Sequence, residues 1–189
     1  IIDAVKNSNI QWFFFSSTSH VYKAINKKIS ETSKKQPISY YGKTKLKAEN
    51  YIISKLKKTE TNYCIGRIFS TSNKDQKKNY LVPDLKKRIK KTKNKILFRN
   101  LNHYRDFISM KEISKIILIL YKKKYNGIIN IGSGKGIHLK EIAKFICKKY
   151  KKQFDFDDNK NPTYLIADNS RLKKFFKINK KTILTKLIF

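Results

Sequence analysis

Tyr41 and Lys45 stand four residues apart at the start of a predicted helix, and this spacing brings both side chains to one helical face. A free phenol has a pKa of about 10, which is too high for a proton carrier at neutral pH. An ammonium group held beside a phenol favours the phenolate. The pair is therefore predicted to exchange a proton with a hydroxyl or carbonyl group of a substrate. The competing interpretation is an exposed tyrosine on a lysine-rich helix.

A cluster of hydroxyl groups supplies a partner for this pair. Ser16, Ser17 and Thr18 stand at the end of the apolar run at 11–16. In open α/β sheets, sites form beyond the carboxyl ends of the strands. Thr18 is therefore expected to bond the same substrate oxygen as Tyr41 and to fix its position.

The elements that must position these residues alternate between strands and helices, which predicts an α/β fold with a mainly parallel sheet. The run at 11–16 is almost continuously apolar, which is typical of a strand buried on both faces. Strands are expected at 11–16, 63–69, 96–98, 106–109, 127–131 and 154–157, and helices at 2–6, 41–58, 81–91, 112–123, 138–149 and 170–176. The tail at 183–189 is ambiguous.

Other chemical motifs are weaker. The glycines at 132–136 lack the spacing of a phosphate-binding loop and indicate a tight turn. The three histidines lack acidic or cysteine neighbours at ligand spacing, so no metal site is expected. Two cysteines without a partner motif favour reduced core thiols and a cytoplasmic protein. The histidines are His20, His103 and His138, and the cysteines are Cys64 and Cys147.

The net charge of +32 suggests attraction to any polyanion at low salt. Only five of the 45 basic residues are arginine, the residue that favours base and phosphate recognition, and the lysines are spread along the whole chain. Specific nucleic-acid binding is therefore not expected. The apolar runs are also far shorter than the roughly 20 residues that span a bilayer, so no membrane association is expected.

Several segments, in order along the chain, resemble the extended short-chain dehydrogenases/reductases, particularly the NAD-dependent sugar epimerase/dehydratase family. This collinearity is more specific than the Tyr-x-x-x-Lys spacing alone. The segments are 15–22, 41–45, 67–69, 81–83, 103–108, 130–134 and 167–170.

The resemblance implies a Rossmann-type sheet, bound NAD or NADP, and a nucleotide-sugar substrate. The catalytic residues would be Thr18, Tyr41 and Lys45. Residues near the cofactor would be Ser16, Ser17, Tyr41, Lys45, Ile68 and Phe69. Substrate would contact Thr18, Ser70, Val82, Pro83 and Arg105, and Arg105 would pair with the diphosphate, with a structural salt bridge to Asp106 or another acid as its alternative role.

The resemblance also divides the chain. Residues 1–69 and 105–126 would finish the Rossmann-type domain, and 70–104 and 127–189 would form a smaller, interleaved substrate-binding domain. The family's glycine-rich turn and the acidic residue that meets the adenosine ribose have no counterpart, so the chain is expected to be incomplete at its N-terminus. Lys23, Ser70 and residues 159–162 depart from the family pattern. The last two departures affect the expected diphosphate and sugar contacts, so the sequence does not name the substrate.

The reaction predicted from the resemblance is hydride transfer at a sugar carbon through NAD(P), with Tyr41 handling the proton. Epimerisation, dehydration and 4-keto reduction share this first chemistry, and the sequence does not separate them. The full-length protein is expected to be a homodimer. The alternatives are a non-catalytic dehydrogenase-like binding protein and an inactive fragment.

Overall fold

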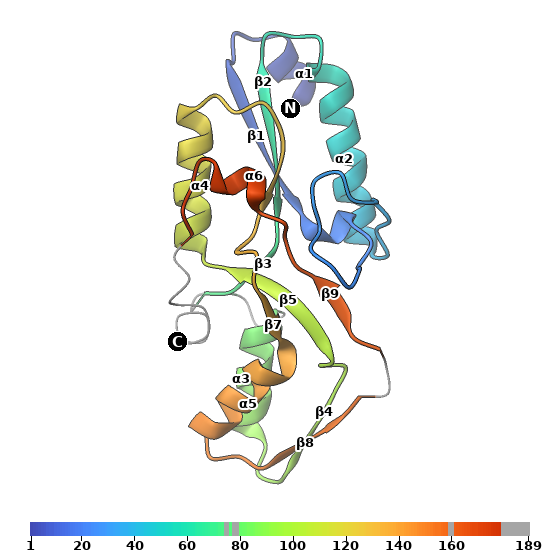
Figure 1. The fold of residues 1–189 in the computed structure, drawn as a ribbon, viewed down its shortest axis with the longest axis vertical. Helices are drawn as coiled ribbons and strands as arrows, with labels where there is room; N and C mark the ends of the chain where they lie inside the picture. Colours follow the sequence, from blue (N-terminus) through green and yellow to red (C-terminus); the bar gives the residue numbers. More distant parts are fainter. Residues whose placement is uncertain (74–75, 77–79, 159–160, 179–189) are drawn as a thin grey trace.

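The computed structural model describes residues 1–73, 76, 80–158 and 161–178. Figure 1 shows an elongated molecule, with a parallel sheet and its helices at one end and a smaller α/β part at the other. The ambiguous tail at 183–189 lies outside the described residues.

The main sheet contains three parallel strands in the order β1-β2-β6, which confirms the predicted α/β fold. Thr18 pairs with Ile68, and Ile68 pairs with Ile131, so the carboxyl ends of the three strands lie at one edge. The strands are β1 (Trp12–Thr18), β2 (Asn62–Ile68) and β6 (Gly127–Ile131).

Helices cover both faces of this sheet (Figure 1). One face carries α1 (Ile2–Lys6) and α2 (Tyr40–Leu56), and its core contains Val5, Ile52, Leu56 and Ile65. The other face carries α4 (Met110–Lys122) and the short α6 (Ser170–Lys173). Its core consists of Cys64, Ile108, Ile113, Ile116, Leu120, Ile129, Ile131 and Leu172.

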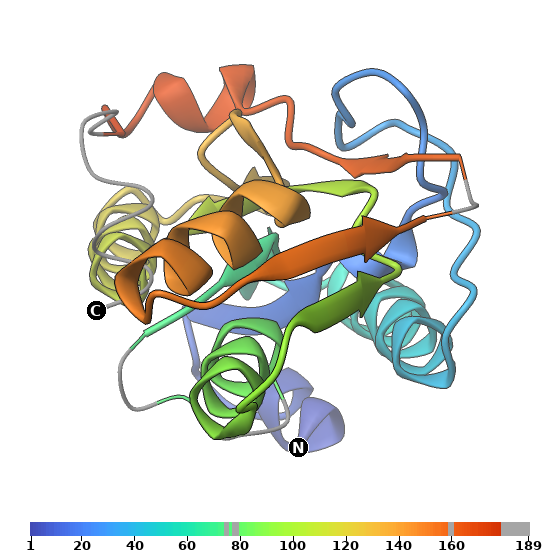
Figure 2. The same ribbon diagram turned by 90° about the horizontal axis from the view of Figure 1, so that it is seen from below.

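The smaller part is built around β5 (His103–Ile108). This strand pairs in parallel with β3 (Ser70–Thr71) and β9 (Thr163–Leu165), and antiparallel with β7 (Gly136–His138). A separate parallel pair joins β4 (Ile96–Arg99) to β8 (Phe154–Asp157). Figure 2 shows the helices α3 (Leu81–Lys91) and α5 (Leu139–Lys149) side by side, and they share one apolar core with these strands.

Two expectations need correction. The strand at 11–16 packs on both faces, with Trp12 and Phe14 against one core and Phe13 and Phe15 against the other. These side chains are only partly buried, because within the described residues β1 lies at the sheet edge beside β2 alone. The domain boundary expected at residue 126 also moves, because β6 pairs with β2 and so belongs to the main sheet.

Several short elements had no counterpart among the expectations. They are β3, β7, β9 and the 3-10 turn η1 (Ser19–Val21). Both cysteines are free and buried. Among the described residues, no helix has the length and apolar character needed to cross a bilayer.

Candidate active site

A cavity of about 660 Å³ lies where the carboxyl ends of β1 and β2 meet the smaller part of the molecule. Its walls come from β1, η1, the start of α2, the segment after β2, α3 and β5. Most of the residues singled out in the sequence line it: Ser16, Ser17, Thr18, Tyr41, Ile68, Phe69, Ser70, Val82 and Arg105. Lys45 and Pro83 are not part of this lining.

The hydroxyl segment of β1 forms one wall. Ser17 and Thr18 are buried, at 3% and 6% exposure, whereas Ser16 is exposed. The Thr18 hydroxyl caps the following 3-10 turn by accepting a hydrogen bond of 3.3 Å from the His20 N–H. Thr18 is thus fixed at the point where the strand ends and the chain turns away.

The first turn of α2 places Tyr41 at the cavity. Ser39 caps this helix by accepting a hydrogen bond of 3.1 Å from the Gly42 N–H, so the helix begins just before Tyr41. The Tyr41 side chain is 52% exposed and reaches the cavity.

Lys45 lies one helical turn after Tyr41, as its spacing predicted. Its amine donates a hydrogen bond of 2.8 Å to the Ser16 carbonyl and lies 5.8 Å from the centre of the Tyr41 ring. The ammonium therefore contacts the hydroxyl segment and lies near the Tyr41 ring, although Lys45 does not itself line the cavity.

Arg105 forms part of the opposite wall. Its guanidinium donates to the Tyr104 and Thr163 carbonyls at 2.8 and 3.0 Å and to the Thr163 hydroxyl at 3.0 Å. The alternative salt bridge with Asp106 does not form, because Asp106 instead accepts hydrogen bonds from the turn after β6 and from Ala167. Among the described residues, Arg105 forms no ion pair.

His20 is a cavity residue that the sequence reasoning missed. It is exposed, lines the cavity, and its ring meets the Tyr41 ring edge-on with 6.2 Å between the centroids. Burial of part of the ring and the charge of Arg105 lower the pKa of His20, which favours the neutral imidazole. Within the described residues, no group of three or more His, Cys, Asp or Glu side chains could hold a metal ion.

Two further residues were missed because they lie behind the cavity wall. Glu49 on α2 and Arg67 on β2 form an ion pair of 2.7 Å, and each side chain is 1% exposed. Glu49 also accepts a hydrogen bond from the Ser17 hydroxyl. The available signal was the helical period, because Glu49 follows Tyr41 and Lys45 at intervals of four residues.

Solved structures share this architecture. UDP-N-acetylglucosamine 4-epimerase from Methanobrevibacter ruminantium M1, in complex with UDP-N-acetylmuramic acid, has a TM-score of 0.84 and 26% identity. UDP-glucuronic acid 4-epimerase from Bacillus cereus, in complex with UDP-glucuronic acid and NAD, has a TM-score of 0.86 and 24% identity. RMD from Pseudomonas aeruginosa, complexed with NADPH, has a TM-score of 0.83 and 17% identity.

These alignments cover nearly the whole of this chain but only part of each relative. They include 98% of this chain and 63% of the Methanobrevibacter enzyme, 99% and 62% for the Bacillus enzyme, and 99% and 69% for RMD. The chain thus spans about 63% of the length of the first of these relatives.

The sequence also matches a family model. This model describes the NAD dependent epimerase/dehydratase family and covers residues 1–132, which include the hydroxyl segment, Tyr41, Lys45 and Arg105. Since this match extends over most of the chain, the chain belongs to the NAD dependent epimerase/dehydratase family.

Proposed function

We propose that the protein containing this chain is an NAD(P)-dependent oxidoreductase acting on a nucleotide-sugar. The observation that carries the proposal is the arrangement at one cavity: Thr18 at the end of β1 and Tyr41 in the first turn of α2 both line it, and Lys45, one turn further along α2, is anchored on the Ser16 carbonyl. Membership of the family and the ligands of the similar solved structures support it.

The cavity fits the nicotinamide end of NAD or NADP. Ile68 and Phe69 provide an apolar wall for the flat ring beside Ser16 and Ser17, although the Ser17 hydroxyl itself donates to Glu49. When bound, the cofactor supplies a centre that takes a hydride from a sugar carbon and can return it. Lys45, whose amine already bonds the adjacent Ser16 carbonyl, would hold the ribose next to that ring.

The chain's own residues would handle the proton and the position of the reacting oxygen. Tyr41 would remove the proton from the sugar hydroxyl while the carbon that bears this hydroxyl gives its hydride to the cofactor, and would return the proton on reduction. Thr18 would hold the same oxygen by a hydrogen bond, so that the oxygen faces the phenol. Lys45 would favour the phenolate form of Tyr41, which is the form that accepts this proton.

The substrate would extend from this point toward the smaller part of the molecule. Arg105 has a planar fork of donors suited to a diphosphate, and Ser70 and Val82 line the space between it and the reacting centre. Pro83 lies in the first turn of α3 beside Val82 but does not line the cavity. It would contact the nucleobase at the edge of the site. Epimerisation, dehydration and 4-keto reduction all begin from this arrangement.

The test is a comparison of nucleotide-sugars with matching free sugars, using the full-length protein with NAD or NADP. Reduction of the cofactor is followed by absorbance, and products are identified by NMR. We expect turnover of a nucleotide-sugar and none of the free sugar, and an Arg105→Lys variant should raise KM because a point charge replaces the fork. Equal rates on free and nucleotide-linked sugars would contradict the substrate class.

The predicted homodimer is a separate proposal. Light scattering on the full-length protein would test it, and a monomer at micromolar concentration would overturn it.

A further inference from the structure

Glu49 and Arg67 form a charged pair that the proposed chemistry does not use. The Arg67 Nε donates to both Glu49 oxygens at 3.1 and 3.2 Å, and its Nη2 donates to Oε2 at 2.7 Å. Both side chains are almost completely buried. A buried ion pair adds little to stability when compared with well-packed apolar side chains, because desolvation offsets the attraction. Stability alone therefore does not explain why the pair is here.

The pair touches the residue next to Thr18. Glu49 accepts a hydrogen bond from the Ser17 hydroxyl, which is buried with it. Lys45, one helical turn earlier on α2, bonds the Ser16 carbonyl at 2.8 Å. The helix that carries Tyr41 thus holds the two residues immediately before Thr18.

Arg67 holds the chain on the other side of Thr18. Its Nη1 donates to the Tyr22 hydroxyl at 2.8 Å, and Tyr22 in turn donates to Asn130 Oδ1 at 2.7 Å. Burial raises the pKa of Tyr22 to about 12, so the hydroxyl keeps the proton that it donates. The segment from Ser17 to Tyr22 is therefore anchored at both ends by one ion pair.

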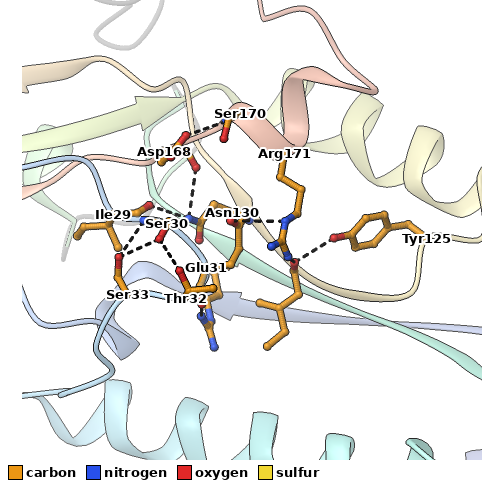
Figure 3. Close-up of polar contacts among 12 residues, drawn as sticks. Ile29, Ser30, Glu31, Thr32, Ser33, Tyr125, Asn130, Asp168, Ser170 and Arg171 are labelled. Carbon is orange, nitrogen blue, oxygen red and sulfur yellow. Dashed lines mark hydrogen bonds and ion pairs between the residues drawn. The ribbon is translucent and has the colours of Figure 1, made fainter.

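The network continues from Asn130 toward α6, and Figure 3 shows the contacts around Asn130, Glu31 and Arg171. The Asn130 side chain donates to the Ile29 carbonyl at 2.8 Å, and its backbone N–H donates to Glu31 at 2.8 Å. Arg171 of α6 lies 3.7 Å from the other Glu31 oxygen and donates to the Ile128 carbonyl at 2.9 Å. These contacts fix Asn130, and so fix the acceptor on which Tyr22 depends.

We propose that Glu49 and Arg67 are positioning residues that set the Thr18 hydroxyl in register with Tyr41. They act through Ser17 on one side and Tyr22 on the other, and neither reaches the substrate. The kinetic part of this inference rests on the proposed function, whereas the position of Thr18 can be measured without turnover.

The test uses Ser17→Ala, Glu49→Gln and the double variant in the full-length protein. Ser17→Ala removes the contact with the site and leaves the ion pair intact, so it stays informative if Glu49→Gln unfolds. Ile52→Val is the matched control, because Ile52 is buried on α2 in the same interface but outside the network. The readouts are kcat, KM and the methyl NMR resonance of Thr18.

We expect each network variant to lower kcat roughly 10- to 100-fold with little change in KM, the size of effect that a small misplacement of a catalytic group produces. The Thr18 resonance should move in both single variants. The double variant should add little to the loss of kcat, because both changes act on the same hydrogen bond between Ser17 and Glu49. Ile52→Val should change neither kcat nor the Thr18 resonance.

A Thr18 resonance that stays unchanged in Ser17→Ala would overturn the inference, as would fully additive losses of kcat. If the wild-type protein shows no turnover on any nucleotide-sugar, the proposed function fails. The resonance of Thr18 then still decides the positioning role by itself.

Discussion

His20 lines the same cavity as Tyr41, and its charge depends on pH. Partial burial and the charge of Arg105 lower its pKa below the ordinary value of 6.5. Between the lowered pKa and 6.5 the unfolded chain binds more protons than the folded one, so the stability of the fold falls as pH falls through this range.

We predict that His20→Gln reduces the loss of stability on acidification. Melting temperatures at pH 7.5 and pH 5.5 would be compared for the wild-type protein and the variant. The drop should be smaller in the variant, because the histidine that resists protonation in the folded state is gone. An equal drop in both proteins would show that other groups cause the acid sensitivity.

At the residue scale, the sequence predicted the groups that face the cavity better than the groups behind it. Tyr41, Lys45 and Thr18 could be found because a spacing and a strand end indicate what they do. Glu49 and Arg67 could not be paired in advance, since they come from a helix and a strand whose contact depends on the tertiary fold. His20 was missed because it was assessed only as a metal ligand.

At the scale of elements, Gly42 allows α2 to approach the hydroxyl segment. A Cβ at this position would contact the His20 carbonyl oxygen and come within 2.9 Å of the Pro37 Cβ. The helix start that carries Tyr41 can therefore lie against η1 only while residue 42 lacks a side chain.

Gly42→Ala is predicted to destabilise the fold by roughly 1–3 kcal/mol through overpacking. It should also lower turnover, because the His20 backbone lies only two residues after Thr18. Urea denaturation and kcat would be measured together, with Lys43→Ala as the control at the next, exposed position. A variant as stable and active as this control would contradict the tight approach.

The longer elements were predictable and the short ones were not. Helix α3 and strand β6 were expected with the bounds that the structure shows, and Ser109 and Glu112 form a capping box that begins α4. Strands β7 and β9 have three residues each, too few for an alternating pattern. Their strand conformation follows from pairing with β5, which the sequence does not reveal.

At the scale of the whole molecule, Asp106 connects the two parts. It is fully buried on β5, and its carboxylate accepts bonds of 2.8 Å from the backbone N–H groups of Ser133 and Gly134 and of 3.1 Å from that of Ala167. One carboxylate therefore joins β5 to the turn after β6 and to the segment that follows β9.

Asp106→Asn should cost roughly 2–4 kcal/mol of unfolding free energy, because an amide group would face buried N–H donors. Chemical denaturation measures this loss. Asp157→Asn is the control, since its ion pair with Arg99 is solvent-exposed and contributes less than about 1 kcal/mol. Similar losses in both variants would contradict the connecting role.

The net charge of +32 also acts over the whole molecule. We predict binding to heparin and to nucleic acids at low salt, with affinity that falls steeply as salt rises and does not depend on base sequence. Titrations of two unrelated RNA sequences at 50 and 300 mM salt would test this. Affinity for one sequence that persists at the higher salt would instead support a nucleic-acid-binding role.

The role of Tyr41 as the proton carrier is tested most directly by measuring kcat of the full-length protein with Tyr41→Phe. The matched control variant is Tyr40→Phe. Tyr40 precedes Tyr41 on α2, is 83% exposed and does not line the cavity. Loss of the hydroxyl at position 41 should lower kcat by orders of magnitude while the circular dichroism spectrum is unchanged, and loss at position 40 should have no effect. Near-normal turnover in Tyr41→Phe would contradict the central claim that this phenol carries the proton.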